Sequence, residues 1–222
     1  MPISSPLRLC LWLSTAAILL ALAPVTLAQP SAMQLARAVD AHYNLLHSLR
    51  AGFREQFDGL GMTRDEAGTL LLQKPGKMRW EYSSTPGKLF VLDGKYAWFY
   101  APGDTQVQRI PASQLDDLRS PLRFLLGHTK LQNELTNLTV APAQPNAWLL
   151  TGIPKGQEKR VARLQLTVTE TGQILAIEID ELDGARTRFH LSNEQPNPPI
   201  PPSAFHFIPP PGVPVVDALP PV

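Results

Sequence analysis

Cysteine is almost absent from this chain of 222 residues, since Cys10 is the only one. Cys10 lies inside an apolar run near the N-terminus, so the rest of the chain cannot form a disulfide within itself. Small exported domains often depend on disulfides for their stability. Here, side-chain packing and backbone pairing have to supply that stability.

An excess of charge of either sign is also missing. Lys and Arg together number 20, and Asp and Glu together number 19. Arg8 is the only charged residue before Gln29, so residues 29–222 carry 19 charges of each sign and have zero net charge with neutral histidines. Nucleic-acid binding normally leaves a basic patch or stripe. We therefore expect no nucleic-acid partner.

Catalytic patterns are missing as well. The sequence has no G-x-S-x-G around a serine, no H-E-x-x-H and no glycine-rich phosphate loop. His42 lies on the apolar side of a predicted helix, and we expect a buried, hydrogen-bonded histidine there rather than a ligand or a base. The sequence predicts no enzyme, no metal site and no cofactor, and a hydrolase is the least favoured class of function.

No apolar run is long enough to cross a membrane. The run Leu9–Ala23 is shorter than the roughly 20 residues that a spanning helix needs, and a proline follows it. Thr26 and Ala28 are small residues at the positions that signal peptidase requires. We expect residues 1–28 to be a signal peptide cleaved after Ala28, with an uncleaved anchor as the alternative. Residues 29–222 are then long enough for a single domain.

The spacing of apolar residues changes near residue 49 from helical to strand-like. Met33–Leu49 has apolar residues spaced by three and four, which predicts an amphipathic helix capped by Ser31. From Leu49 to Phe57 apolar and polar residues alternate, which predicts a strand. Asp93-Gly94 is the strongest hairpin signal that follows. The other predicted strands are Ala67–Lys74, Met78–Tyr82, Lys88–Leu92, Lys95–Tyr100, Gln106–Ile110, Trp148–Gly152, Val161–Glu170, Gln173–Leu182 and Ala185–Ser192.

Prolines mark the segments between and after these two blocks of strands. Short helices are predicted at Ala112–Leu118 and Pro121–Leu126, each beginning at or next to a proline. The C-terminal segment 195–222 is Pro-rich and should form no regular helix, although Ala204–Ile208 and Val213–Val216 could each pair at a sheet edge. The pattern predicts a mainly β protein with helices (α+β), built on an antiparallel sheet.

Aromatic residues gather between residues 74 and 102, which hold two of the four tryptophans and three of the four tyrosines. Strand alternation places Met78, Trp80 and Tyr82 on one face. The helix predicted at Pro121–Leu126 is apolar over most of its circumference. A concave sheet face under an apolar lid would explain both features. An ordinary core beneath the sheet is the alternative.

Five segments resemble, in order and spacing, the outer-membrane lipoprotein carrier proteins of the LolA family. The segments are KPGKMRWEY, VLDGKYAWFY, QVQRI, PLRFLLG and FHFIPPPGVPVVD. The resemblance extends from the first helix to about Asp217. It implies an incomplete antiparallel β-barrel whose open side is closed by a helical lid. It also implies a periplasmic, monomeric shuttle that takes acylated lipoproteins from an inner-membrane transporter to an outer-membrane receptor.

The resemblance and the strand alternation together predict a site for acyl chains. The residues expected to contact the chains are Phe53, Phe57, Met78, Trp80, Leu89, Val91, Trp98 and Tyr100. The residues expected in the lid are Leu122, Phe124, Leu125 and Leu126. A slip of one residue in any strand would exchange residues of one face for those of the other.

Family members commonly carry an arginine before the proline that opens the "RW" strand, where it resembles a latch for the lid. This sequence has Lys74 there, which keeps a charge but lacks the planar fork of arginine. A contact between Lys74 and carbonyls near Gly127 is expected, with Arg79 or Arg123 sharing the role.

The alternative function is a binding module of the same fold that senses lipoproteins or glycolipids and signals to a membrane partner.

Overall fold

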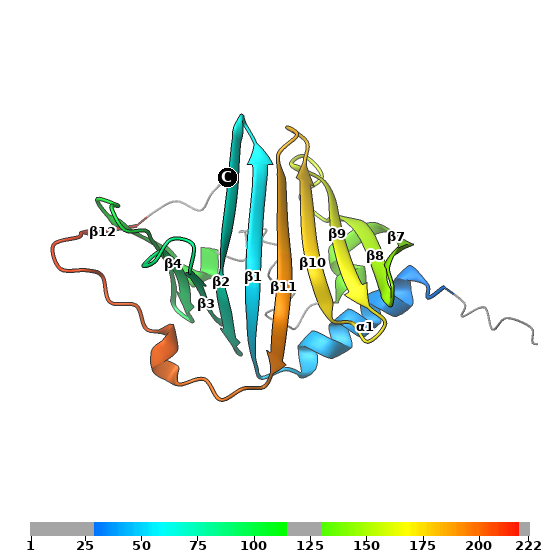
Figure 1. Cartoon of the computed structure of the whole chain (residues 1–222), viewed down its shortest axis with the longest axis horizontal. Helices are drawn as coiled ribbons and strands as arrows, with labels where there is room; N and C mark the ends of the chain where they lie inside the picture. Colours follow the sequence, from blue (N-terminus) through cyan, green and yellow to red (C-terminus); the bar gives the residue numbers. More distant parts are fainter. Residues whose placement is uncertain (1–28, 115–129, 218–222) are drawn as a thin grey trace, which may run out of the picture.

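The computed structural model of the chain describes residues 29–114 and 130–217. They form an open 12-stranded sheet with the strand order β12-β6-β5-β4-β3-β2-β1-β11-β10-β9-β8-β7. Neighbouring strands are antiparallel, except that β12 runs parallel to β6. Because β12 and β7 remain at opposite edges, the sheet does not close (Figure 1). The predicted mainly β fold with an incomplete barrel is confirmed.

Consecutive strands pair with each other on both sides of the central pair, β1 and β11: β1 to β6 on one side and β7 to β11 on the other, with β12 added at the edge beside β6. Their bounds are β1 Ser48–Gly59, β2 Met62–Gln73, β3 Lys77–Tyr82, β4 Leu89–Asp93, β5 Tyr96–Tyr100, β6 Val107–Pro111, β7 Leu135–Gln144, β8 Ala147–Pro154, β9 Val161–Thr169, β10 Ile174–Glu181, β11 Arg186–Pro196 and β12 Val215–Asp217.

Helix α1 (Ala32–Leu45) begins at the predicted cap. The backbone N–H of Gln34 donates to Ser31 Oγ over 3.2 Å, and the Gln34 side chain accepts from the Ser31 N–H over 2.8 Å. This reciprocal pair satisfies two donors that a helix start leaves open. The helix ends four residues earlier than predicted, because β1 already begins at Ser48.

Other differences from the sequence prediction lie at strand ends and in irregular segments; β2, for example, begins at Met62 rather than Ala67. Strand β7 was not predicted, and it is an exposed edge strand whose register shifts twice along β8. Ala204–Ile208 does not pair with the sheet, since the 3₁₀-helix η2 (Pro202–Phe205) occupies its first part. The second predicted pairing is confirmed in part by β12. Other short helices are η1 (Ala112–Gln114) and α3 (Leu131–Glu134).

The core lies between α1 and one face of the sheet. Leu35, Val39 and Tyr43 of α1 belong to one buried apolar cluster with residues of eleven strands, β1 to β11. We call the face that α1 covers the inner face; its side chains include Phe53 and Trp80. The opposite side of the sheet is the outer face. A Cβ on Gly172 would lie 2.1 Å from the Ala38 carbonyl oxygen, so the β9–β10 turn can approach α1 only without a side chain.

Polar contacts of α1 fix its position on the sheet. Tyr43 Oη donates to Glu194 Oε2 over 3.0 Å and accepts from the Ile174 N–H over 3.0 Å. His42 Nε2 lies 2.6 Å from Glu194 Oε1, so His42 has a hydrogen-bond partner, as predicted, although it remains half-buried. Burial, followed by the charge of Glu194, raises the pKa of the Tyr43 hydroxyl above its usual value. The hydroxyl therefore stays protonated and keeps both bonds.

Candidate functional site

Aromatic rings from three strands meet on the inner face. The Phe53 ring of β1 lies 4.5 Å from the Trp80 ring of β3 and 5.1 Å from the Tyr82 ring, both edge-to-face. Trp80 also meets Phe189 of β11 edge-to-face, with ring centres 5.6 Å apart. We call Phe53, Trp80, Tyr82 and Phe189 the inner aromatic cluster. Each such pair contributes about 0.5–1.5 kcal/mol beyond the free energy gained by burying the area of its rings.

The register of the sheet extends this apolar surface toward β5. Trp80 faces Phe90 of β4, and Phe90 faces Phe99 of β5. The Phe90 and Phe99 rings are 4.7 Å apart, and both are only partly buried. A Cβ on Gly68 would lie 1.9 Å from the Glu81 carbonyl oxygen and 2.8 Å from Phe53 Cε1. Gly68 thus permits the close approach of β2, β3 and the Phe53 ring.

The eight residues predicted to contact acyl chains divide between the two faces. Phe53, Phe57, Met78 and Trp80 lie on the inner face. The other four lie on the outer face, because each is displaced by one residue from an inner-face position such as Phe90 or Phe99. These four are Leu89, Val91, Trp98 and Tyr100.

The predicted face of β4 and β5 was therefore wrong by one residue. In both strands almost every position is apolar, so the two-residue period of the sequence cannot select a face. Cross-strand pairing with Trp80 selects it, and that pairing brings in Phe90 and Phe99, which the sequence analysis missed. Phe189 of β11 was also missed, because no sequence pattern links it to β3.

The outer-face rings of β5 hold the C-terminal segment. The Phe207 ring lies 5.8 Å from Trp98 and 6.1 Å from Tyr100. The Arg109 guanidinium lies 4.6 Å above the Tyr96 ring, a cation–π contact. We call Tyr96, Trp98, Tyr100 and Phe207 the outer aromatic cluster.

An acidic side chain orients Trp98 in this outer cluster. Trp98 Nε1 donates to Asp93 Oδ2 over 2.8 Å, and the N–H groups of Lys95 and Tyr96 donate to Asp93 Oδ1. Burial alone would raise the pKa of Asp93, but these donated bonds outweigh it and lower the pKa below its usual value. Asp93 therefore remains a charged acceptor that fixes both the hairpin turn and the Trp98 ring.

The two residues predicted as a latch contact different parts of the protein. Lys74 Nζ donates to the carbonyl of Tyr43 in the last turn of α1, where a cation is favoured by the helix dipole. Burial lowers the pKa of Lys74. Arg79 lies on the outer face, where Nε pairs with Glu81 over 3.2 Å and Nη1 donates to the Ala204 carbonyl over 3.4 Å.

The predicted lid and its neighbours lie outside the described residues. They are Leu122, Phe124, Leu125 and Leu126, together with Arg123 and Gly127. Where the chain is described again, the Leu131 N–H donates to Asp40 Oδ1 over 3.0 Å, which attaches α3 to α1. Burial is the main reason that the pKa of Asp40 is raised.

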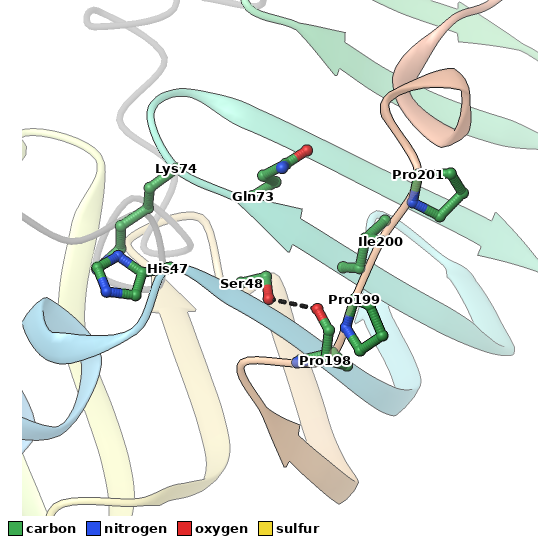
Figure 2. Close-up of a pocket in the computed structure, with 8 residues that line it drawn as sticks. All are labelled: His47, Ser48, Gln73, Lys74, Pro198, Pro199, Ile200 and Pro201. Atoms are coloured by element: carbon green, nitrogen blue, oxygen red, sulfur yellow. Dashed lines mark hydrogen bonds between the residues drawn. The ribbon is translucent and has the colours of Figure 1, made fainter.

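A pocket of about 520 Å³ opens at the end of the sheet where α1 meets β1. Figure 2 shows Lys74 and His47 at one end of it and the segment Pro198–Pro201 at the other. Ser48 Oγ donates to the Pro198 carbonyl over 2.7 Å within its wall. Gln73 also lines the pocket, and its buried Oε1 has no hydrogen-bond partner. This pocket is separate from the inner aromatic cluster.

Two features are absent from the part of the chain that the structure describes. Residues 29–114 and 130–217 contain no group of three or more His, Cys, Asp or Glu side chains placed to hold a metal ion. Within the same residues, no helix is both long and apolar enough to cross a membrane.

Comparison with known proteins places the chain in a family. A family model described as outer membrane lipoprotein carrier protein LolA matches residues 46–208. The outer-membrane lipoprotein carrier protein of Chromobacterium violaceum is 28% identical over 190 residues, which cover 86% of this chain and 91% of that protein. The one from Nitrosomonas europaea is 30% identical over 155 residues, which cover 69% and 73% of the two chains.

Among solved structures, an uncharacterized conserved protein from Thermus thermophilus has a TM-score of 0.54 at 14% identity, over 84% of this chain and 99% of that one. This likeness concerns the fold alone. The family match covers most of the described sheet, including the inner aromatic cluster. The chain therefore belongs to the LolA family of outer membrane lipoprotein carrier proteins.

Proposed function

We propose that this protein binds the acyl chains of lipoproteins on its inner face and carries them through the periplasm. In this proposal it receives them from an inner-membrane transporter and delivers them to an outer-membrane receptor. Residues 1–28 would direct export and be removed after Ala28. The processed chain would act as a single domain and a monomer.

The observation that carries this proposal is the continuous apolar surface from Phe53 to Phe99. It joins the inner aromatic cluster to Phe90 and Phe99 across neighbouring strands. Rings of this size offer a large contact area to a flexible acyl chain. The membership in a family of lipoprotein carriers supports the same use.

The energetics favour a carrier with an apolar surface of this kind. Each methylene group moved out of water gains about 0.8 kcal/mol, so free passage of several long chains through water is too costly. The carrier needs an apolar surface that matches the membrane interior in quality. Trp80 is only 2% exposed and Phe53 only 4%, so loading requires the surface to open.

We place the moving cover in the segment that contains Leu122, Phe124, Leu125 and Leu126, which remains a proposal from the sequence. A cover that is favoured by only a few kcal/mol can open for cargo and close again. Phe124→Glu should weaken binding of a fluorescent acyl probe, because a carboxylate facing acyl chains is costly. Unchanged affinity in that variant would contradict the lid.

Lys74 is the proposed latch for the lid, and it would act through its contact with α1. Its bond to the Tyr43 carbonyl joins the start of the β2–β3 turn to the end of α1. Lys74→Leu should still load lipoprotein but transfer it more slowly to vesicles that carry the receptor. Lys77→Leu, on the other side of the same turn, is the control. Equal transfer rates for all three proteins would remove Lys74 from the mechanism.

The main test compares two aromatic residues on opposite faces. Phe90→Glu places a carboxylate on the partly buried inner surface, and Trp98→Glu places the same group on the outer face. Phe90→Glu should bind a fluorescent acyl probe at least about tenfold more weakly, because burying a carboxylate costs several kcal/mol. Trp98→Glu should bind the probe like the wild type.

Circular dichroism and thermal melting establish that both variants are folded before the affinities are compared. A folded Phe90→Glu protein with wild-type affinity would contradict the proposed site. Loss of affinity in Trp98→Glu alone would move the site to the outer face.

A further inference from the structure

Four charged side chains lie on the inner face just beyond the inner aromatic cluster. Glu55 of β1 stands directly opposite Glu66 of β2, and Arg64 stands opposite Phe57. Lys88, next to the start of β4, reaches Glu66 across the same face. We call Glu55, Arg64, Glu66 and Lys88 the inner charged cluster. It lies between the aromatic rings and the exposed β1–β2 turn, at the end of the sheet opposite to α1 (Figure 1).

The carboxylates of this cluster are buried and the cations are not. The side chains of Glu55 and Glu66 are 10% and 7% exposed, whereas those of Arg64 and Lys88 are 51% and 27% exposed. Two like charges directly opposite each other in a sheet are destabilising unless cations compensate them. The carboxylates therefore serve to hold the two cations in place.

The contacts within the cluster are short and specific. Arg64 Nη2 donates to Glu55 Oε1 over 3.0 Å, and Arg64 Nε pairs with Glu66 Oε2 over 2.9 Å. Lys88 Nζ lies 2.6 and 2.7 Å from the two oxygens of Glu66. A guanidinium has five N–H donors and an ammonium has three. These bonds leave donors available on the exposed side of both cations.

Both cations also adjoin the apolar surface. Lys88 Nζ lies 4.4 Å above the Tyr82 ring, and the Arg64 guanidinium lies 5.4 Å from the Phe57 ring centre. Tyr82 belongs to the inner aromatic cluster, and its hydroxyl donates to Glu55 Oε2 over 3.4 Å. Burial, and then the charges of Glu55 and Glu66, raise the pKa of Tyr82, so its hydroxyl stays a donor. Hydrogen-bond donors thus begin where the aromatic surface ends.

The cluster has no net charge, since two carboxylates balance two cations. It therefore suits neutral acceptors better than anions. An acyl chain in a lipid ends at an ester or amide carbonyl, which accepts hydrogen bonds and cannot donate them. Burying such a carbonyl without a donor costs free energy. A carrier that binds the chains on the aromatic surface needs donors at the position where the chains end.

We propose that Arg64 and Lys88 bind the ester and amide carbonyls at the heads of the acyl chains and so fix how deeply the chains enter. This proposal rests on the proposed function. It sets a direction for the cargo: the carbonyls lie near the β1–β2 turn, and the chain ends point toward α1. Glu55 and Glu66 act as positioning residues, because they hold the cations without touching the lipid.

The test uses two synthetic lipopeptides of equal chain length, one with ester-linked chains and one with ether-linked chains, which lack those carbonyls. The wild type should bind the ester probe about tenfold more tightly, as expected for one or two hydrogen bonds to charged donors. Arg64→Met and Lys88→Met keep an apolar stem but lose the donors. Each should bind the ester probe more weakly while its affinity for the ether probe stays within about twofold.

The matched control is Arg54→Met. Arg54 Nε donates to Asp65 Oδ1 over 2.9 Å in the same β1–β2 hairpin. This ion pair lies on the outer face. This variant should keep the wild-type preference for the ester probe. The control therefore removes one arginine ion pair of the hairpin without removing a donor from the inner face.

The outcomes separate this proposal from the proposed function. Equal affinity of the wild type for both probes would overturn the role of Arg64 and Lys88 but leave the acyl-chain surface intact. An equal loss of affinity for both probes in folded Arg64→Met and Lys88→Met proteins would also overturn it, since the cluster would then be only structural. Failure of the wild type to bind either probe would instead refute the proposed function.

Discussion

The inner and outer aromatic clusters lie on opposite faces of the sheet, and their rings have different partners. Inner rings contact one another, as Phe53, Trp80 and Phe189 do, and only Tyr82 at the edge of the cluster also meets the charged Lys88 and Glu55. Outer rings contact Arg109, Asp93 and the C-terminal segment. The chain thus uses one set of rings to build an apolar surface and another to hold its own tail. The concentration of aromatic residues in this region serves both purposes.

The largest effect should separate the two tryptophans by burial. Trp80→Ala should lower the free energy of unfolding by about 3–5 kcal/mol, because it empties a site in the core. Trp98→Ala should cost at most about 2 kcal/mol, since that ring is only partly buried. Urea unfolding of both variants measures the difference. Equal decreases in the free energy of unfolding for the two variants would contradict the distinction between the clusters.

Gly68 sharpens the comparison, because it serves only the inner side. Gly68→Ala should lower the free energy of unfolding by about 1–3 kcal/mol, since the added Cβ meets the Glu81 carbonyl and the Phe53 ring. Thr69→Ala, at the exposed neighbouring position, is the control and should stay within about 0.5 kcal/mol of the wild type. Chemical denaturation measures both, and a neutral Gly68→Ala would mean that β2 and β3 can separate without cost.

The outer cluster should matter for the C-terminal segment and for little else. Phe207→Ala removes two ring contacts worth about 1 kcal/mol in total, so amide hydrogens of β12 should exchange roughly fivefold faster. Exchange in β1 and β3 should not change. Ile208→Ala, at an exposed side chain, is the control. Faster exchange in β3 would show that the two clusters are coupled.

The smallest effect concerns ion pairs on the outer face. Burial opposes ionisation of Asp180, but bonds from Arg186 and Arg163 outweigh it and lower the pKa of Asp180 below its usual value near 3.8. Its contribution is therefore present above the unfolded pKa and is lost as the pH falls through the lower folded pKa. Asp180→Asn should cost about 1 kcal/mol at pH 7.

Thermal unfolding from pH 7 to pH 2 tests this sign. The difference in melting temperature between the wild type and Asp180→Asn should decrease toward the acidic end, and it should also decrease in about 1 M salt. A gap that widens as the pH falls would contradict the lowered pKa.

The sequence predicted a strand and its faces best where apolar and polar residues alternate clearly along the segment. Turns such as Asp93-Gly94 and the alternation of β1 marked strands that the structure confirms. Strands β4 and β5 were found, but their uniformly apolar sequences left the face to be chosen by pairing with Trp80. Strand β7 was missed because it is an exposed edge strand with Pro142 and a shifted register.

The candidate site was predictable only where one strand carried the signal. Met78 and Trp80 alternate on β3, so their shared face was readable. Phe189 comes from a strand more than a hundred residues away and joins them through the β1–β11 pairing. The inner charged cluster likewise depends on the opposition of Glu55 and Glu66 across a hairpin, which no local pattern indicates.

The most direct measurement is tryptophan quenching by a lipopeptide whose acyl chains carry bromine atoms. Single-tryptophan proteins keep either Trp80 or Trp98, and phenylalanine replaces the other tryptophans. If acyl chains bind the inner face, the bromine atoms should quench Trp80 strongly and leave the emission of Trp98 nearly unchanged. Quenching of Trp98 with Trp80 unaffected would place the acyl chains on the outer face and contradict the account.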